Sequence, residues 1–437
     1  MKKSGFSVIC LAGLAIQAFF GGPAAATEPP AAATIGLDEI RTDMEAWCLT
    51  VFSGTEIERF PLNVLSVVRG HRPGQDMILV QGTDERFNHG GPVHGCSGSP
   101  VYIDGRLAGA LAAGWDGSLD ALYLVRPIAD MRDVGPGPAD APAASGQALK
   151  FDLSGPLDLK DIYADSMNRL EGLDAPGQGL LPLSCSLPDA VCRAFESPLC
   201  RMGLIPFSAP AAGESQMQPF EAGGVLSLVL CGGDISLAAT GTVTEVVGDQ
   251  VYGFGHSFTG RGAVNFPIAA GVVHSVVASR TSSFKFSSPG PVLGTLNYDQ
   301  SFAVRGTVGQ APDTIPLTIH VDRYNAPGPR TYECYLASDR TYTPLILQLV
   351  LNGAARVQGP LPPEHTVRYD ASIKLKGREP LVIKNLSSGR RTADLEQALY
   401  AIAGLALNNP FRELPLESVE ATMTITPDDR TAEVEAV

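Results

Sequence analysis

The sequence predicts a mostly β protein. Only 18% of the residues are charged, whereas the chain contains 47 Gly and 34 Pro, a balance typical of strands joined by many turns. Short apolar runs, such as residues 64–68 and 77–80, are separated by Gly, Pro and Asp. The length of these runs favours strands over helices.

The first residues predict a secretory signal peptide. Lys2 and Lys3 precede an apolar stretch from about Phe6 to Phe20, and small residues follow as far as Ala26, which is the pattern of a leader that is removed on export. We therefore expect segment 1–26 to be cleaved after Ala26 without a lipid anchor. The mature protein is then expected to be periplasmic or secreted and to contain two or three domains. No later apolar run approaches the roughly 18 residues needed to span a bilayer.

Charge and cysteine spacing exclude several classes of partner. The net charge is −14, and loss of the two leader lysines makes the protein more acidic, which disfavours nucleic acids and anionic membrane surfaces. No CxxC, HExxH or His-x-His pattern is present, so we expect neither a metal nor a cofactor. Seven cysteines follow the leader, so at least one is free or paired between chains. Cys185, Cys192 and Cys200 are close enough in sequence to contain a disulfide.

Stretches rich in Pro and Gly, which interrupt helices and strands, indicate where the chain divides into segments. The segments expected after the leader are 34–132, 133–222, 223–326 and 331–437. Residues 133–146 form a Pro/Gly/Ala-rich linker, and the rest of the second segment is an insertion that holds the three closely spaced cysteines. The β pattern resumes at Val225, and Gly248 and Asp249 indicate a tight turn between two strands.

We expect the last segment to be a sandwich-like, β-rich accessory domain with one helix. That helix begins at about Asp394, with Gln397 completing a capping-box pattern, and ends at Asn408-Asn409-Pro410. Leu395, Leu399, Ile402 and Leu405 recur at helical spacing, which predicts a face packed on the core. No internal repeat is evident, which argues against solenoids and propellers.

Residues 95–100 read Gly-Cys-Ser-Gly-Ser-Pro and precede two short β-rich runs joined by Asp104-Gly105. Small neighbours leave room for a substrate carbonyl beside Ser97, and the backbone N–H groups of Gly95 and Ser97 are suited to bind an oxyanion. A serine hydroxyl needs a neighbouring base to become a good nucleophile.

Seven histidines limit the choice of that base. We expect loop or surface roles for His89 and His94, because His94 lies within the loop that must build the oxyanion site. His256 follows Gly-Phe-Gly at the end of a predicted strand, where a side chain can enter a cleft.

The two segments that carry Ser97 and His256 together resemble the SpoIVB-type S55 serine peptidase family, with its G-M-S-G-S-P and A-[FL]-G-H motifs. The likeness extends over residues 37–132 and 222–322. It implies an exported serine endopeptidase with Ser97 as nucleophile, His256 as general base and Ser99 as a structural companion. It also implies a protein or peptide substrate, the protein itself included.

The order of the two segments is unusual for this family. In the sporulation peptidase the histidine segment comes first, whereas here the serine segment does, as in an exported subgroup of the family. The implied fold is a trypsin-like double β-barrel with permuted halves, and the site would assemble between them.

The resemblance leaves two candidates for the acid that orients the base. The family has a Thr-Asp pair upstream of the nucleophile, which matches Thr83-Asp84, so Asp84 is the first choice. Asp299 is the alternative because it follows His256 at a distance similar to that in trypsin-like barrels.

Three departures from the family pattern are also evident. Cys96 replaces a methionine, Ser257 replaces a common proline, and a glycine-rich segment near the start is replaced by residues 43–48. The competing hypothesis is a catalytically degenerate envelope protein that uses the same fold to bind a protein partner.

Overall fold

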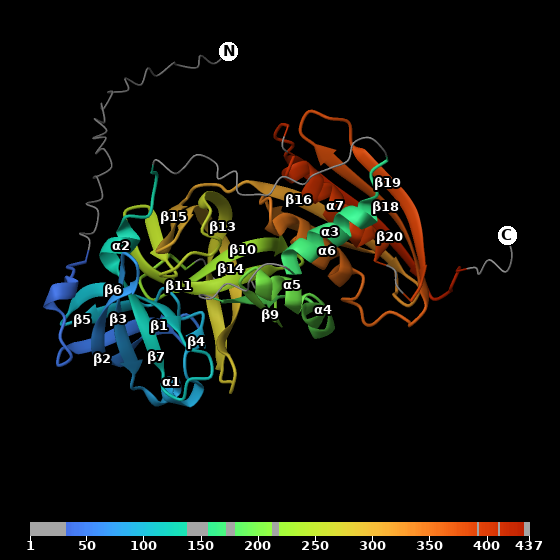
Figure 1. Ribbon diagram of the computed structural model, residues 1–437. Coiled ribbons are helices and arrows are strands. Elements are labelled where there is room, and N and C mark those ends of the chain that lie inside the picture. The colour runs from blue at the N-terminus through green and yellow to red at the C-terminus, as the bar shows by residue number, and fades with distance from the viewer. Residues whose placement is uncertain are drawn as a thin grey trace, which may run out of the picture.

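Strands dominate the structure, as the composition predicts. The computed structural model describes residues 32–137, 156–171, 180–211, 218–390, 393–409 and 411–431. The predicted leader 1–26 and most of the predicted linker 133–146 lie outside these residues. In Figure 1 a barrel, a middle region of long strands and a C-terminal region of strands and helices lie in a row.

The N-terminal part forms a closed antiparallel barrel with the strand order β1-β2-β3-β7-β6-β5. Its strands and short helices are β1 (Glu45–Val51), β2 (Ile57–Arg72), β3 (Gln75–Gly82), α1 (Glu85–Gly90), β4 (Val93–His94), β5 (Pro100–Ile103), β6 (Arg106–Gly114), β7 (Leu122–Pro127) and α2 (Ile128–Arg132). The predicted turn at Asp104-Gly105 is confirmed, since Ile103 pairs with Arg106. Both turn residues have positive φ, 51° and 76°, as a tight hairpin turn requires.

Aromatic side chains fill one end of the barrel. Phe60 and Phe87 are fully buried, and their rings lie 5.0 Å apart in an edge-on arrangement. Phe52 and Tyr123 extend this cluster, with ring centroids 4.5 Å from Phe60 and 5.7 Å from Phe87 respectively. Such contacts add to the burial of apolar area.

The rest of the chain forms one large mixed sheet. Its strands are β8 (Leu181–Cys185), β9 (Leu204–Ser208), β10 (Val225–Gly233), β11 (Leu237–Val247), β12 (Gln250–Gly253), β13 (Gly262–Val277), β14 (Ser283–Gln300), β15 (Ala303–Val308), β16 (Thr314–Arg323), β17 (Arg330–Ala337), β18 (His365–Leu375), β19 (Leu381–Gly389) and β20 (Leu416–Thr426), together with β4. Within it the antiparallel pairings β10-β13-β14-β15-β12-β11 return to β10 and close a circuit. The turn predicted at Gly248 and Asp249 is confirmed between β11 and β12.

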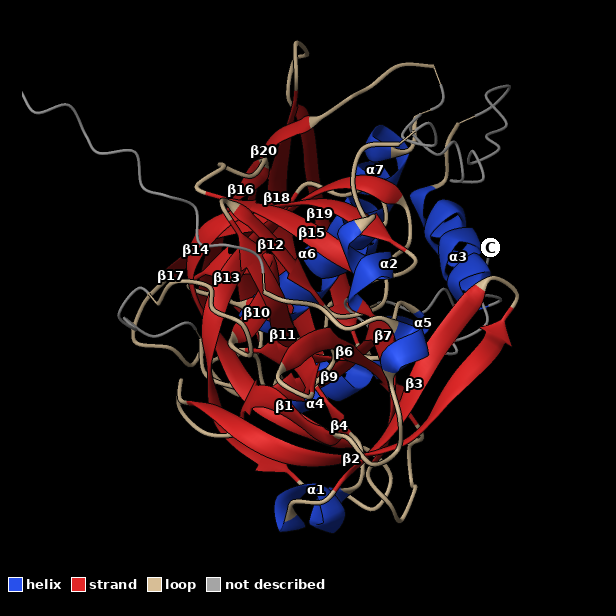
Figure 2. Ribbon diagram, turned by 90° about the vertical axis from the view of Figure 1, so that its left-hand side faces the viewer, coloured by secondary structure: helices blue, strands red, loops and turns tan. Residues whose placement is uncertain are grey.

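Five helices of the described residues pack beside this sheet. They are α3 (Leu159–Glu171), α4 (Asp189–Ala194), α5 (Glu196–Arg201), α6 (Tyr342–Ala354) and α7 (Asp394–Leu407). Of these, α4 and α5 pack against β9, whereas α3, α6 and α7 pack together beside β16–β20 (Figure 1, Figure 2). The expected sandwich is not formed, because β16–β20 continue the large sheet and helices cover it.

The prediction of one helix in segment 331–437 was wrong, because α6 also lies there. Its sequence YTPLILQLVLNGA is mostly apolar, and all but Asn352 of its residues are buried. A continuous apolar run does not reveal by periodicity whether it is strand or helix. The helix α7 itself is confirmed, and Leu395 and Leu399 are buried as predicted. The predicted capping box is absent, because α7 begins after Ala393 without a side-chain cap.

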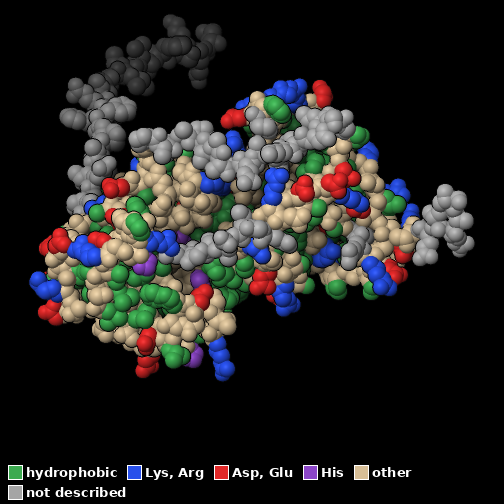
Figure 3. Space-filling model, in the orientation of Figure 1, with side chains coloured by type: hydrophobic (Ala, Val, Ile, Leu, Met, Phe, Trp, Pro, Cys, Tyr) green, Lys and Arg blue, Asp and Glu red, His purple; other side chains and the backbone are tan. Residues whose placement is uncertain are grey.

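The seven cysteines of the described residues are free thiols. The thiols of Cys185 and Cys192 donate to Leu183 O and Leu187 O, so the disulfide that the spacing of Cys185, Cys192 and Cys200 allows is not formed in this structure. No helix of the described residues combines the length and the hydropathy needed to cross a membrane. On the face drawn in Figure 3, acidic and basic side chains are interspersed, and hydrophobic side chains gather over the barrel.

Phe60→Ala tests the contribution of the aromatic cluster. We expect it to lower the free energy of unfolding by about 3–5 kcal/mol, because it removes a fully buried aromatic ring and leaves a cavity. Urea denaturation followed by circular dichroism measures this. Leu65→Ala in the same strand is the control, because Leu65 is 38% exposed and should change stability by less than about 1 kcal/mol. Equal effects of the two substitutions would contradict the prediction.

Candidate active site

Ser97 lies in the loop between β4 and β5. Gly95 and Gly98 flank it with φ values of 93° and 96°, a conformation that favours glycine. The Ser97 side chain is half-buried and borders a cavity of about 370 Å³. Its hydroxyl, and the backbone N–H groups of Gly95 and Ser97, make no hydrogen bond with any other described residue. These groups are therefore without a partner among the described residues, and Ser97 is the one of the two residues that borders the cavity.

Strand β11 of the large sheet holds this loop in place. The Thr242 N–H donates to Ser97 O at 2.9 Å, and its hydroxyl donates to Gly95 O at 2.8 Å. The Thr244 hydroxyl donates to Gly98 O at 2.7 Å. A Cβ at Gly98 would lie 2.0 Å from Thr242 O, so only glycine permits this approach. The loop of the barrel is thus fixed by the sheet.

The segment that carries His256 is fixed by the same threonine. The Phe254 N–H donates to Thr242 O at 3.3 Å, and a Cβ at Gly255 would lie 3.1 Å from Ala112 in β6. Phe254 is fully buried and has φ of 67°, an unusual value for a bulky residue. Residues far apart in sequence, Ser97 and His256, are therefore brought to the same junction between the barrel and the sheet.

His256 is held as a neutral imidazole. It is 5% exposed, and its Nδ1 lies 2.8 Å from Ser257 O. Because a carbonyl only accepts hydrogen bonds, Nδ1 carries the proton and Nε2 has a free lone pair. The pKa of His256 is lowered to about 4, chiefly by burial and to a smaller extent by Arg126 and His94, although the hydrogen bond to Ser257 O acts to raise it.

Nε2 of His256 is buried without a hydrogen-bond partner among the described residues. It is not hydrogen-bonded to the Ser97 hydroxyl in this structure. Such bonds are often long in a free enzyme and tighten when substrate binds. An unpaired, unprotonated nitrogen is the form that can accept a proton.

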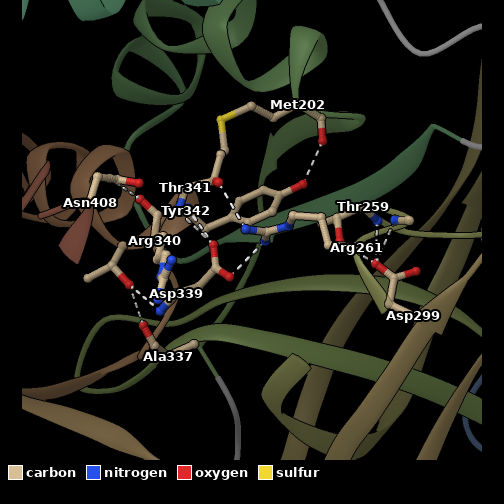
Figure 4. Close-up of polar contacts among 12 residues, drawn as sticks. Met202, Thr259, Arg261, Asp299, Ala337, Asp339, Arg340, Thr341, Tyr342 and Asn408 are labelled. Atoms are coloured by element: carbon tan, nitrogen blue, oxygen red, sulfur yellow. Dashed lines mark hydrogen bonds and ion pairs between the residues drawn. The ribbon is translucent and has the colours of Figure 1, made fainter. Parts of the chain in front are cut away.

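Asp299 organises the loop that follows His256 (Figure 4). Its carboxylate is fully buried and accepts hydrogen bonds from the N–H groups of Phe258 at 2.7 Å and Gly260 at 3.0 Å, and from both the N–H and hydroxyl of Thr259 at 2.5 Å. Burial raises the pKa of Asp299 despite these donors. The carboxylate does not touch His256, so its effect on the imidazole is through the loop.

The same loop is anchored at its far end. Arg261 forms an ion pair with Asp339 at 2.7 Å and donates a hydrogen bond to Thr341 (Figure 4). Both partners precede α6. The loop between β12 and β13 is therefore tied to β14 and to the base of a buried helix.

Asp84, the first choice for the orienting acid, lies at the N-terminus of α1 in the structure. It caps α1, and its carboxylate accepts hydrogen bonds from the backbone N–H of Arg86 at 2.9 Å and from the Arg86 guanidinium. These bonds lower the pKa of Asp84. The structure shows no contact between Asp84 and His256.

Sequence reasoning missed Lys285 in β14. This lysine is fully buried, packs against Gly95, and donates to the hydroxyls of Thr242 at 3.1 Å and Thr50 at 2.7 Å. Burial lowers the pKa of its amine. Neither Lys285 nor Thr242 belongs to a recognisable motif, because their roles depend on which strands meet.

His94, which we assigned to a loop or surface role, borders the Ser97 cavity. Its Nε2 lies 2.8 Å from an oxygen of Asp116, and its Nδ1 lies 2.8 Å from Leu180 O. Cys96, in contrast, is fully buried in the barrel core, and burial raises the pKa of its thiol. The Ser99 hydroxyl is buried without a partner among the described residues.

Residues 24–114 match the family model described as SpoIVB peptidase S55. The match includes the Ser97 loop and ends with β6, so it confirms the resemblance for the first segment and does not extend to His256. No curated protein and no solved structure matches the chain.

Gly98→Ala tests the contact between the loop and β11. We expect a loss of stability of about 3 kcal/mol or more, because the added methyl meets Thr242 O and φ is positive. Gly105→Ala is the matched control, since φ there is 76° but nothing lies within 4 Å of a Cβ. It should cost about 1–2 kcal/mol from backbone strain alone. Urea denaturation of both variants measures the difference, and equal losses would contradict the clash.

Proposed function

We propose that this protein is a serine endopeptidase in which Ser97 and His256 carry out the reaction on a protein or peptide substrate. The observation that supports this most strongly is the position of Thr242. The Thr242 N–H donates a hydrogen bond to Ser97 O, and the Thr242 carbonyl accepts one from the N–H of Phe254. Phe254 lies two residues before His256. A serine peptidase needs a nucleophile and a base on a common rigid support, and this threonine provides one.

Each chemical step has a residue suited to it. Ser97 Oγ attacks the scissile carbonyl while His256 Nε2 accepts the hydroxyl proton, and the N–H groups of Gly95 and Ser97 stabilise the oxyanion. The same imidazole then returns the proton to the leaving amine. Water hydrolyses the acyl-enzyme with His256 again as the base.

The orienting group for His256 is the Ser257 carbonyl in this proposal. That carbonyl fixes the tautomer through Nδ1, the role that a carboxylate has in a Ser-His-Asp triad. Asp299 supports it by holding residues 258–260. This arrangement favours Asp299 over Asp84 as the acid associated with the site.

The fold invites comparison with a trypsin-like double barrel. The barrel that carries Ser97 has six antiparallel strands, and the circuit from β10 to β15 also has six. We propose that these are the two permuted halves of one peptidase unit. We also propose that residues 1–26 direct export.

The fluorophosphonate reactivity of Ser97 tests this function. We expect the purified protein to become covalently labelled, Ser97→Ala to lose the label, and Ser99→Ala to keep it, because Ser99 is fully buried. Intact-mass spectrometry measures labelling. A folded wild-type protein that remains unlabelled would instead favour the binding-protein hypothesis.

The pH profile tests the assignment of His256. Because the pKa of His256 is lowered to about 4, the acidic limb of kcat/KM should have its midpoint near pH 4, well below the ~6.5 of an unperturbed imidazole. The unfolded chain binds this proton more tightly, so the folded state loses stability as the pH falls from about 6.5 to 4. Circular dichroism at each pH separates unfolding from titration. A midpoint near 6.5 in folded protein would argue against His256 as the base.

A further inference from the structure

We infer that the cavity beside Ser97 is the primary specificity pocket and that it takes a large apolar side chain, so the substrates are peptides with Leu, Met or Phe immediately before the scissile bond. This rests on the proposed function. The side chain of that residue is the one closest to the carbonyl that Ser97 attacks. A pocket that adjoins the nucleophile therefore selects it.

The strands of the barrel contribute buried apolar residues to the wall of the pocket. Leu111 and Ala112 of β6, Tyr123 and Leu124 of β7, and Val93 of β4 are all buried residues of its lining. Side chains that are fixed on paired strands form a pocket before the ligand arrives. The volume of about 370 Å³ accommodates a large side chain.

Small residues give the pocket its depth. The end of β6 reads Ala112-Ala113-Gly114, and a Cβ at Gly114 would lie 2.8 Å from the Pro92 side chain. The place of a side chain at Gly114 is thus taken by Pro92, whereas Ala112 and Ala113 leave space in the pocket that larger side chains would fill. The pocket therefore favours Leu, Met or Phe over Ala or Ser.

The polar side chains at the pocket already have partners within the protein. Both ring nitrogens of His94 lie 2.8 Å from oxygen acceptors, Leu180 O and Asp116, so its polar atoms are paired without a ligand. The Tyr123 hydroxyl accepts from the Val93 N–H, and burial raises its pKa so that it stays neutral. The remaining ionisable lining residue is His71. A charged substrate side chain would lose its hydration here without gaining a counter-charge.

Peptide binding to Ser97→Ala tests the pocket without turnover. The chain has two tryptophans, and Trp115 lines the pocket, so its fluorescence in a Trp47→Phe background reports occupancy. The probes are blocked hexapeptides that differ only at the third residue, titrated at pH 8. We expect Leu or Phe peptides to bind at least tenfold more tightly than Lys or Glu peptides. Equal or tighter binding of the charged peptides, or no response to any peptide, would overturn the inference.

Asp116→Asn provides a second measurement. It removes a negative charge from the lining of the pocket, so the Glu peptide should gain affinity relative to the Leu peptide. Asp120→Asn in the same loop is the matched control, because Asp120 is exposed and lies outside the lining. A shift of equal size in both variants would overturn the role of the His94–Asp116 pair.

Cleavage of the same peptides by the wild-type protein separates the two proposals. Selective binding of apolar peptides without cleavage or fluorophosphonate labelling would support the apolar specificity of the pocket and contradict the peptidase function. Labelling and cleavage with a preference for Lys or Glu peptides would support the peptidase function and contradict the apolar specificity.

Discussion

The structure of the site depends on Thr242, where the barrel meets the large sheet. Its N–H, carbonyl and hydroxyl bond three different segments of chain: the Ser97 loop, the strand end before His256, and Lys285. Because these bonds are buried, neither loop can shift without breaking several of them. Glycine at position 98 is also required, since a methyl group there would push the Ser97 loop away from β11.

The same junction explains why the imidazole is ready to act as a base. Burial keeps His256 neutral, and the Ser257 carbonyl determines which nitrogen carries the proton. The positive φ of Phe254 is backbone strain next to the site, where surrounding contacts must hold it. Asp299 supplies such contacts, because its carboxylate accepts hydrogen bonds from the N–H groups of Phe258 and Gly260 in the turn that follows. The carboxylate thus holds the loop after His256 without touching the imidazole.

The sequence predicted the local parts of the site well. Gly-Cys-Ser-Gly-Ser-Pro forms a glycine-flanked loop, and His256 follows the end of a strand, because turns and strand ends depend on nearby residues. The hairpins at Asp104-Gly105 and Gly248-Asp249 are predictable for the same reason. The helix α6 was missed because its fully apolar sequence has no amphipathic period. Its burial against the sheet is a property of the whole fold.

By itself the sequence determined the mostly β class, the six-residue motif around Ser97 and the candidate base. Tertiary structure decided which polar groups meet: Thr242 and Lys285 lie beneath the loop, and His94 pairs with Asp116 at the pocket. It also decided that Asp84 caps a helix beside Arg86, which the family motif could not reveal. The physical reason is that hydrogen bonds and burial between distant segments are set by strand pairing and packing, and these leave no periodic or local trace in the chain.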